Sequence, residues 1–131
     1  MGELRVLQFE RDKLFQIGFP ELAKRVVHEE AEGNRPGWDI SSFDENQQPI
    51  CIEVKSSIGK INQLEITYNE WEAAKRKGDT YFIYLVQNLT EHGPLKIELI
   101  KDPVRYVNQK EFCIKTVSYN LKLSREWMEK H

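Results

Sequence analysis

Apolar residues recur with the period of a helix in two stretches before residue 34. The first stretch runs to about Gln16. Its apolar positions are Leu4, Leu7, Leu14 and Phe15. The second stretch is FPELAKRVVHEEAEG, residues 19–33, and its apolar stripe consists of Leu22, Val26 and Val27. Pro20 suits the first turn of a helix and Gly33 can end one. We therefore predict two helices in this part of the chain.

An alternation of apolar and polar residues follows at 38–43 and 50–56, which predicts two strands joined by the turn-rich DENQQP. In the second strand, two sets of side chains alternate, namely Ile50, Ile52 and Val54 with Cys51, Glu53 and Lys55. The aliphatic set should face one side of a sheet, and the acid and the base should share the other side. A turn centred near Asn46 would put Asp39 opposite Glu53, or one position from it.

The remaining pattern predicts one more internal helix and further strands. ITYNEWEAAKRKGD reads as a helix in which Thr67 and Glu70 form a capping box and Gly78 ends the last turn. The later elements are a central strand at 80–89, a more exposed strand at 94–100, another strand at 112–119 and a short helix at 124–131. This order predicts one domain over residues 1–131, of mixed α/β class.

Composition narrows the functional classes only a little. The 131 residues are 40% hydrophobic and 31% charged, which is ordinary for a globular domain. The net charge of -2 gives no bulk positive field, so nucleic-acid binding would need a local basic patch. Cys51 and Cys113 lie in strand-like runs without a C-x-x-C spacing, which favours two buried thiols in a reducing compartment. Because we find no signal peptide and no membrane span, we expect a cytoplasmic protein.

Several common kinds of site do not fit the sequence. His28, His92 and His131 have no H-x-x-x-H spacing, so we do not propose a zinc site. Ser56 and Ser57 lack the G-x-S-x-G elbow of a serine hydrolase. GKINQ lacks the earlier glycine of a phosphate-binding loop.

The strongest candidate chemistry lies on the predicted hairpin. Asp39 and Glu53 on neighbouring strands would repel each other unless a cation lay between them, and their oxygen ligands suit Mg²⁺ or Mn²⁺. Lys55, on the same face, would then point toward whatever the metal holds, which suits phosphodiester cleavage. A half-exposed strand with an ordinary solvated face shows the same spacing, so spacing alone leaves both interpretations open.

Basic residues near this hairpin have two interpretations as well. Lys75, Arg76 and Lys77 end the helix predicted after the hairpin, where they would interact favourably with the helix dipole. The same side chains, together with Lys60 in the polar segment SSIGKINQ, could instead contact phosphates of a nucleic acid.

Linked motifs in a fixed order give the chain a resemblance to a known family. Asp39 followed by IEVK, residues 52–55, resembles the PD-(D/E)XK nuclease signature. More narrowly, GWDI, then IEVKSS, then ITYNEWEAAKRKGDTYFIYLV is similar to the domain at the C-terminal end of the plant protein NO VEIN. Tryptophan replaces the usual tyrosine before Asp39. The similarity runs from about Gly37 to Val86, and KDPVRYV continues it more weakly.

The resemblance implies a restriction-endonuclease-like core, with a central mixed β-sheet flanked by helices. It implies that Asp39 and Glu53 bind Mg²⁺ or Mn²⁺ and that Lys55 assists the attacking water. An accessory acid is common in such nucleases, and Glu21, Glu29 and Glu30 compete for that role, with Glu30 favoured for its place nearest the hairpin. The T-x-N-E segment of the family falls on Thr67, Asn69 and Glu70. Helix capping accounts for Thr67 and Glu70, whereas Asn69 could contact a phosphate. Trp71 and Ala74 should belong to the core.

These features lead to two hypotheses. The first is a magnesium-dependent endonuclease that hydrolyses DNA in a restriction or antiviral defence system. In this hypothesis the protein could form a homodimer and could be part of a larger protein with helicase or restriction modules. In it, a protonated Lys55 positions the reactants electrostatically. The second is a catalytically silent fold of the same kind that binds nucleic acid or a protein partner.

Overall fold

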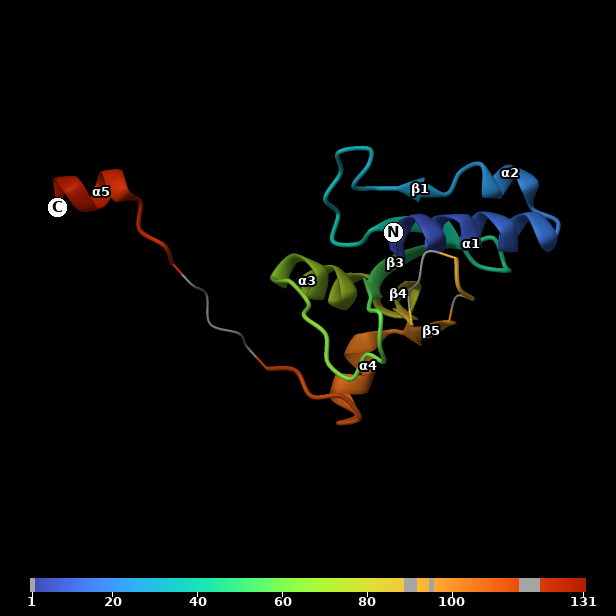
Figure 1. Ribbon diagram of the computed structural model, residues 1–131. Coiled ribbons are helices and arrows are strands. Elements are labelled where there is room, and N and C mark those ends of the chain that lie inside the picture. Colours follow the sequence, from blue (N-terminus) through green and yellow to red (C-terminus); the bar gives the residue numbers. More distant parts are fainter. Residues whose placement is uncertain (1, 89–91, 95, 116–120) are drawn as a thin grey trace.

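A computed structural model describes residues 2–88, 92–94, 96–115 and 121–131. The elements in chain order are α1 (Gly2–Gln16), α2 (Pro20–Ala23), β1 (Val27–His28), β2 (Ile40–Phe43), β3 (Pro49–Ser56), α3 (Tyr68–Lys77), the 3-10 turn η1 (Gly78–Thr80), β4 (Tyr81–Gln87), β5 (Lys96–Lys101), α4 (Pro103–Asn108) and α5 (Arg125–Lys130) (Figure 1). The predicted mixed α/β class is confirmed.

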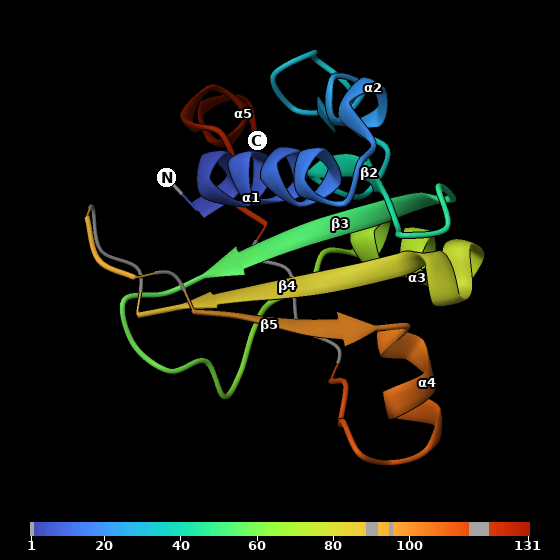
Figure 2. The same ribbon diagram turned by 90° about the vertical axis from the view of Figure 1, so that its right-hand side faces the viewer.

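The strands form one sheet in the order β1-β2-β3-β4-β5. β3 and β4 are parallel, and every other neighbouring pair is antiparallel. The parallel pair requires a crossover connection, which α3 supplies between the end of β3 and the start of β4 (Figure 2).

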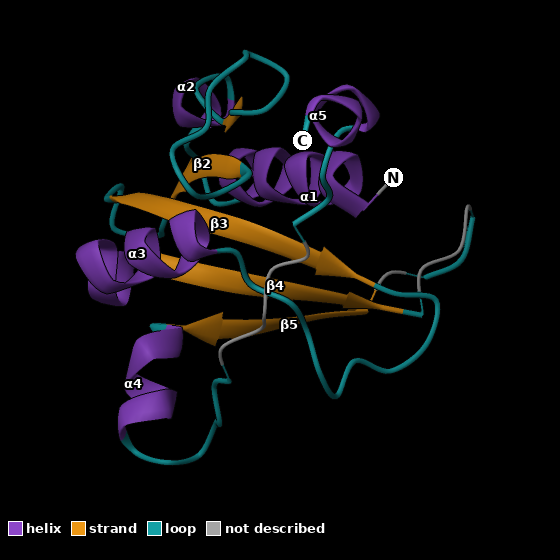
Figure 3. Ribbon diagram, turned by 90° about the vertical axis from the view of Figure 1, so that its left-hand side faces the viewer, coloured by secondary structure: helices purple, strands orange, loops and turns teal. Residues whose placement is uncertain are grey.

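Helices cover both faces of this sheet, α1 and α2 on one side and α3 on the other (Figures 2 and 3). The aliphatic set of β3, represented by Ile52, packs in the core beneath α1 and α2 together with Val6 and Leu14. Cys51 belongs to a second core beneath α3, with Ala73 and Ala74. The predicted division of β3 into two faces is therefore confirmed.

The second predicted helix is wrong beyond its first turn. Helix α2 ends at Ala23, and Val27 and His28 pair with Ser41 and Ile40 as the edge strand β1. The helical stripe could not distinguish these outcomes, because a β-branched pair at Val26 and Val27 also suits a strand. Pairing with β2 satisfies backbone groups that this sheet edge would otherwise leave open.

The other predicted elements have mixed outcomes. Helix α3 has both hydrogen bonds of the capping box, and the strands β4 and β5 and the helix α5 form where expected. The strand expected at 112–119 is absent from 112–115, and 116–119 lie outside the described residues. Both cysteines are free thiols, but Cys113 is exposed and only Cys51 is buried, which corrects the expectation of two buried thiols. Within the described residues, no helix has the length and apolar character needed to span a membrane.

Candidate active site

Asp39 is held in place by the glycine two residues before it. Gly37 has a φ of +106°, and a Cβ atom there would lie 2.6 Å from the Cβ of Ala73 and 2.8 Å from the carbonyl oxygen of Asn69. Only glycine therefore allows this loop to pack directly on α3. The hydroxyl of Tyr81 donates a 2.8 Å hydrogen bond to the Gly37 carbonyl and fixes the loop from below. The sequence GWDI thus brings Asp39 to the sheet at a defined position.

Asp39 directly precedes β2, where the β2–β3 ladder ends, and its backbone bonds to the residue next to Glu53. Ile40 pairs with Ile52, and the Asp39 N–H donates to the Ile52 carbonyl at 2.9 Å. Of the two positions left open by the sequence, this bond gives the one that is one residue from Glu53. The Asp39 Oδ2 accepts a 2.8 Å hydrogen bond from the Val54 N–H. Burial raises the pKa of Asp39 to about 6, although the Val54 N–H bond opposes this and the Glu3 charge adds to it.

Glu53 lies on the β3 face that α3 covers, and it is only 3% exposed. This burial excludes the interpretation of Glu53 as part of an ordinary solvated strand face. Burial, followed by the nearby charge of Asp39, raises the pKa of Glu53 to about 9, while Lys55 acts in the opposite direction. The Glu53 side chain in turn lowers the pKa of Asp39, against the larger effect of burial. The two carboxyls therefore share a proton more easily than they ionise together.

Lys55 lies between two acids from different elements. Its Nζ is 3.0 Å from Glu53 Oε2 and 2.9 Å from Glu70 Oε1 in the first turn of α3. Burial lowers the pKa of Lys55, but these two acids outweigh the burial and the net shift is upward. The expectation of a protonated Lys55 therefore agrees with the direction of this shift.

Glu70 has a role that sequence reasoning missed. Its Oε1 accepts a 3.0 Å hydrogen bond from the Thr67 N–H, as the capping box predicts, and the same oxygen binds Lys55. The helix cap and the candidate site are thus one network. The signal was present in the sequence, because the T-x-N-E segment and the E-x-K segment occur together in the family resemblance.

Glu30, the favoured accessory acid, has two other potential metal ligands beside it. It forms a cluster with Glu3 and His28, in which one potential ligand atom of each residue lies within 4.8 Å of the others, and His28 Nε2 is 2.9 Å from Glu3 Oε2. The cluster adjoins the site, because the Glu3 charge helps to raise the Asp39 pKa. Sequence spacing missed Glu3 and His28, since the three residues come from different elements. The competing Glu21 pairs with Lys24 instead.

Only some of the residues predicted to contact phosphates lie near the candidate site. Asn69 donates to the Arg35 carbonyl at 3.3 Å, Lys75 pairs with Glu72 at 2.6 Å, and Lys77 lies 5.3 Å above the Trp38 ring. These two lysines and Arg76 lie in the last turn of α3, about 8 Å along the axis from its first turn. Lys60 alone of the four cations shares a pocket with Lys55.

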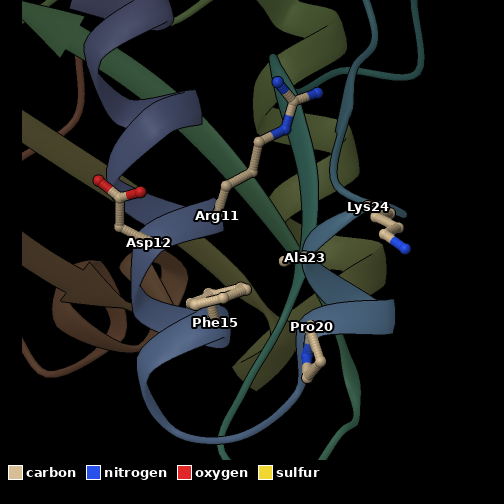
Figure 4. A pocket seen from close by; sticks show the side chains of 6 residues that line it. All are labelled: Arg11, Asp12, Phe15, Pro20, Ala23 and Lys24. Carbon is tan, nitrogen blue, oxygen red and sulfur yellow. The ribbon is translucent and has the colours of Figure 1, made fainter.

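Two pockets are candidate locations for the chemistry. One, of about 410 Å³, lies between α1 and α2 on the opposite face of the sheet (Figure 4). It is lined by Arg11, Asp12, Phe15, Pro20, Ala23 and Lys24, none of which is a candidate site residue. The other, of about 450 Å³, adjoins Lys55 and is formed by the end of β3 and the segment that follows it. The candidate site belongs with the second pocket.

Comparisons with known proteins give one match. The family model described as "Protein NO VEIN, C-terminal" matches residues 2–100. Its range includes α1 and every strand except the last residue of β5. KDPVRYV, residues 101–107, lies beyond the matched range. Searches of curated proteins and of solved structures found no match.

Proposed function

The chain belongs to the NO VEIN C-terminal family, and we propose that it is a metal-dependent nuclease whose site consists of Asp39, Glu53 and Lys55. The observation that carries this proposal is the pair of carboxyls at Asp39 and Glu53. Glu53 lies on β3 and Asp39 directly precedes the adjacent strand β2, both have raised pKa values, and Glu53 is almost completely buried. Perturbed acids of this kind are typical of functional sites.

A divalent cation fits this pair chemically. The raised pKa values mean that a proton on one carboxyl relieves the repulsion between Asp39 and Glu53, and a cation would serve the same purpose. Carboxylate oxygens are ligands for Mg²⁺ and Mn²⁺, so these two residues would hold the ion. When bound, such an ion polarises a phosphoryl oxygen and acidifies water. Glu3, His28 and Glu30 would supply the neighbouring ligands, and the imidazole would favour Mn²⁺ over Mg²⁺.

Lys55 would act as a fixed positive charge. Its raised pKa keeps it protonated, so it cannot accept a proton from water at neutral pH. It can instead orient the attacking water and offset negative charge that develops on the phosphoryl group. Glu70 is a positioning residue, because its contact with Lys55 Nζ holds the ammonium group next to Glu53.

The direct test is cleavage of plasmid DNA, single-stranded DNA and RNA with Mg²⁺ or Mn²⁺, compared with chelator. Glu53→Ala and Lys55→Met should each abolish cleavage, whereas Glu98→Ala on the exposed face of β5 should leave it unchanged. Manganese calorimetry adds a readout without catalysis, because binding should be lost in both Asp39→Ala and Glu53→Ala. Undiminished cleavage in Lys55→Met would contradict the proposed role of that residue.

The second candidate function is a silent fold that binds nucleic acid or a protein partner. The Lys55 network favours it, because the ammonium group already contacts the side chains of Glu53 and Glu70 without any ion. Such a satisfied network could be purely structural. Manganese binding without cleavage of any substrate would support this function over the nuclease.

The wider context stays a prediction. We propose DNA as the substrate, a restriction or defence role, and a cytoplasmic location. A homodimer would let two sites cut two strands, and helicase or restriction modules could select the target. Cleavage patterns on circular and linear DNA, together with the mass of the protein in solution, would test these expectations.

A further inference from the structure

The pocket beside Lys55 is large enough for part of a nucleotide. Its volume is about 450 Å³, within the range of ligand sites in proteins. It is lined by Val54, Lys55, Ser56, Ser57, Lys60, Ile61, Asn62, Gln63, Leu64 and Glu65. All of these residues come from β3 and the segment between β3 and α3, visible in Figure 3 as the loop that leaves the arrowhead of β3. The lysine of the proposed site is therefore one wall of the pocket.

The wall opposite β3 is anchored to the sheet. The Ile61 N–H donates a 2.7 Å hydrogen bond to Oε1 of Gln87, whose side chain is buried at the end of β4. The Ser57 N–H donates to the Val86 carbonyl at 2.9 Å. Ile61 and Leu64 also pack against the core beneath α3. These contacts hold the pocket in a defined shape before any ligand binds.

The chemistry of the lining points to a base rather than to a phosphate alone. The amides of Asn62 and Gln63 have no hydrogen-bond partner within the part of the chain that the structure describes. An amide offers both a donor and an acceptor, which is the pairing that base edges require. The Glu65 carboxylate would repel a phosphate but can accept a bond from an amino group of a base. Lys55 and Lys60 supply the positive charge on the other side.

We propose that this pocket holds an unpaired nucleotide next to the scissile phosphate, so that the substrate is a single strand or a frayed end. This inference rests on the proposed nuclease function. A base inside a duplex is stacked and presents only its edges in the grooves, so a concave pocket receives it only after it has left the stack.

The charge of the chain agrees with a single-stranded substrate. Binding to an intact duplex depends mostly on many phosphate contacts, but the net charge is -2, and of Lys60, Lys75, Arg76 and Lys77 only Lys60 lines the pocket. None of the described residues that line the pocket is aromatic, so the stacking that often binds single strands does not supply the affinity here. Hydrogen bonds from Asn62 and Gln63 therefore provide recognition, which implies a preference among bases.

The test is binding of fluorescein-labelled 12-nucleotide strands of dA, dC, dG or dT, and of a blunt duplex, by fluorescence anisotropy. Measurements in Ca²⁺ and in chelator separate binding from cleavage. Single strands should bind at least about tenfold more tightly than the duplex, and Asn62→Ala with Gln63→Ala should remove about tenfold of that affinity and even out the four bases. The matched pair Asn108→Ala with Gln109→Ala, at the end of α4, should change nothing.

Equal binding of duplex and single strands, or full affinity in the Asn62 and Gln63 variant, would overturn the inference. Thermal unfolding of each variant shows whether it remains folded. Failure of the nuclease proposal looks different, because the wild-type protein would then bind single strands through the pocket but cut none of them. If the protein cleaves an intact duplex, and the Asn62 and Gln63 variant cleaves it equally well, the nuclease proposal stands and the inference about the pocket is wrong.

Discussion

Replacing Glu53 by glutamine should stabilise the metal-free protein, and the gain should grow with pH. The pKa of Glu53 rises from 4.5 to about 9 on folding. Between these values the folded state keeps a proton that the unfolded state releases, so the free energy of unfolding falls as pH rises. Glutamine has nearly the same shape and does not titrate, and its side-chain oxygen can still accept a hydrogen bond from Lys55.

The magnitude follows from the width of this interval. One pKa unit corresponds to about 1.4 kcal/mol, so the stability of wild type should fall relative to Glu53→Gln by up to about 1.4 kcal/mol per pH unit. From pH 5 to pH 8 the gap should widen by about 2 to 4 kcal/mol, the lower figure allowing for relaxation around the charge. Glu53 is 3% exposed, so solvent screening reduces this little. Asp39 adds a smaller contribution between pH 3.8 and about 6, because burial raises its pKa as well.

The assay is urea unfolding in chelator at pH 5, 6, 7 and 8. Glu98→Gln, which removes an exposed carboxyl on β5, is the matched control and should follow wild type at every pH. Manganese should then raise the stability of wild type at pH 8 and leave Glu53→Gln unchanged, because the ion replaces the proton. A gap between wild type and Glu53→Gln that does not change with pH would refute the reasoning.

Three other changes test neighbouring parts of the site. Gly37→Ala should lower the free energy of unfolding in urea by about 2 kcal/mol or more, because φ is +106° and the methyl group would overlap α3. The control Gly59→Ala should lower it little, because the added methyl group meets no atom within 4 Å. Glu70→Gln should keep the helix cap, since glutamine also serves in a capping box. It should lower the pKa of Lys55 in an NMR titration, because Lys55 loses a charged partner, and an unchanged pKa would contradict the assigned pairing. Manganese affinity should increase between pH 6 and pH 8 by at most about tenfold per pH unit, because Glu53 must lose its proton before the ion binds. Calorimetry in two buffers would contradict this if it showed no proton release on binding.

Local patterns predicted much of the frame that carries the site. The alternation in β3, the turn before it and the capping box at Thr67 each depend on neighbours within a few residues, and the structure has all three. The nearness of Asp39 to Glu53, to within one position, followed from the same local information, because a short hairpin allows few registers. The sequence by itself therefore determined which acids lie on adjacent strands.

Tertiary structure decided what surrounds those acids. The same alternation in β3 is compatible with a solvated face or a covered one, and only the packing of α3 buries Glu53 and raises its pKa. The pairing of β1 with β2, which replaced a predicted helix, and the approach of Glu3 to His28 join residues that are 12 to 25 positions apart. Periodicity and capping depend on interactions between residues that are close in the sequence. Burial and charge pairing depend on how whole elements pack against each other, and no local pattern contains that information.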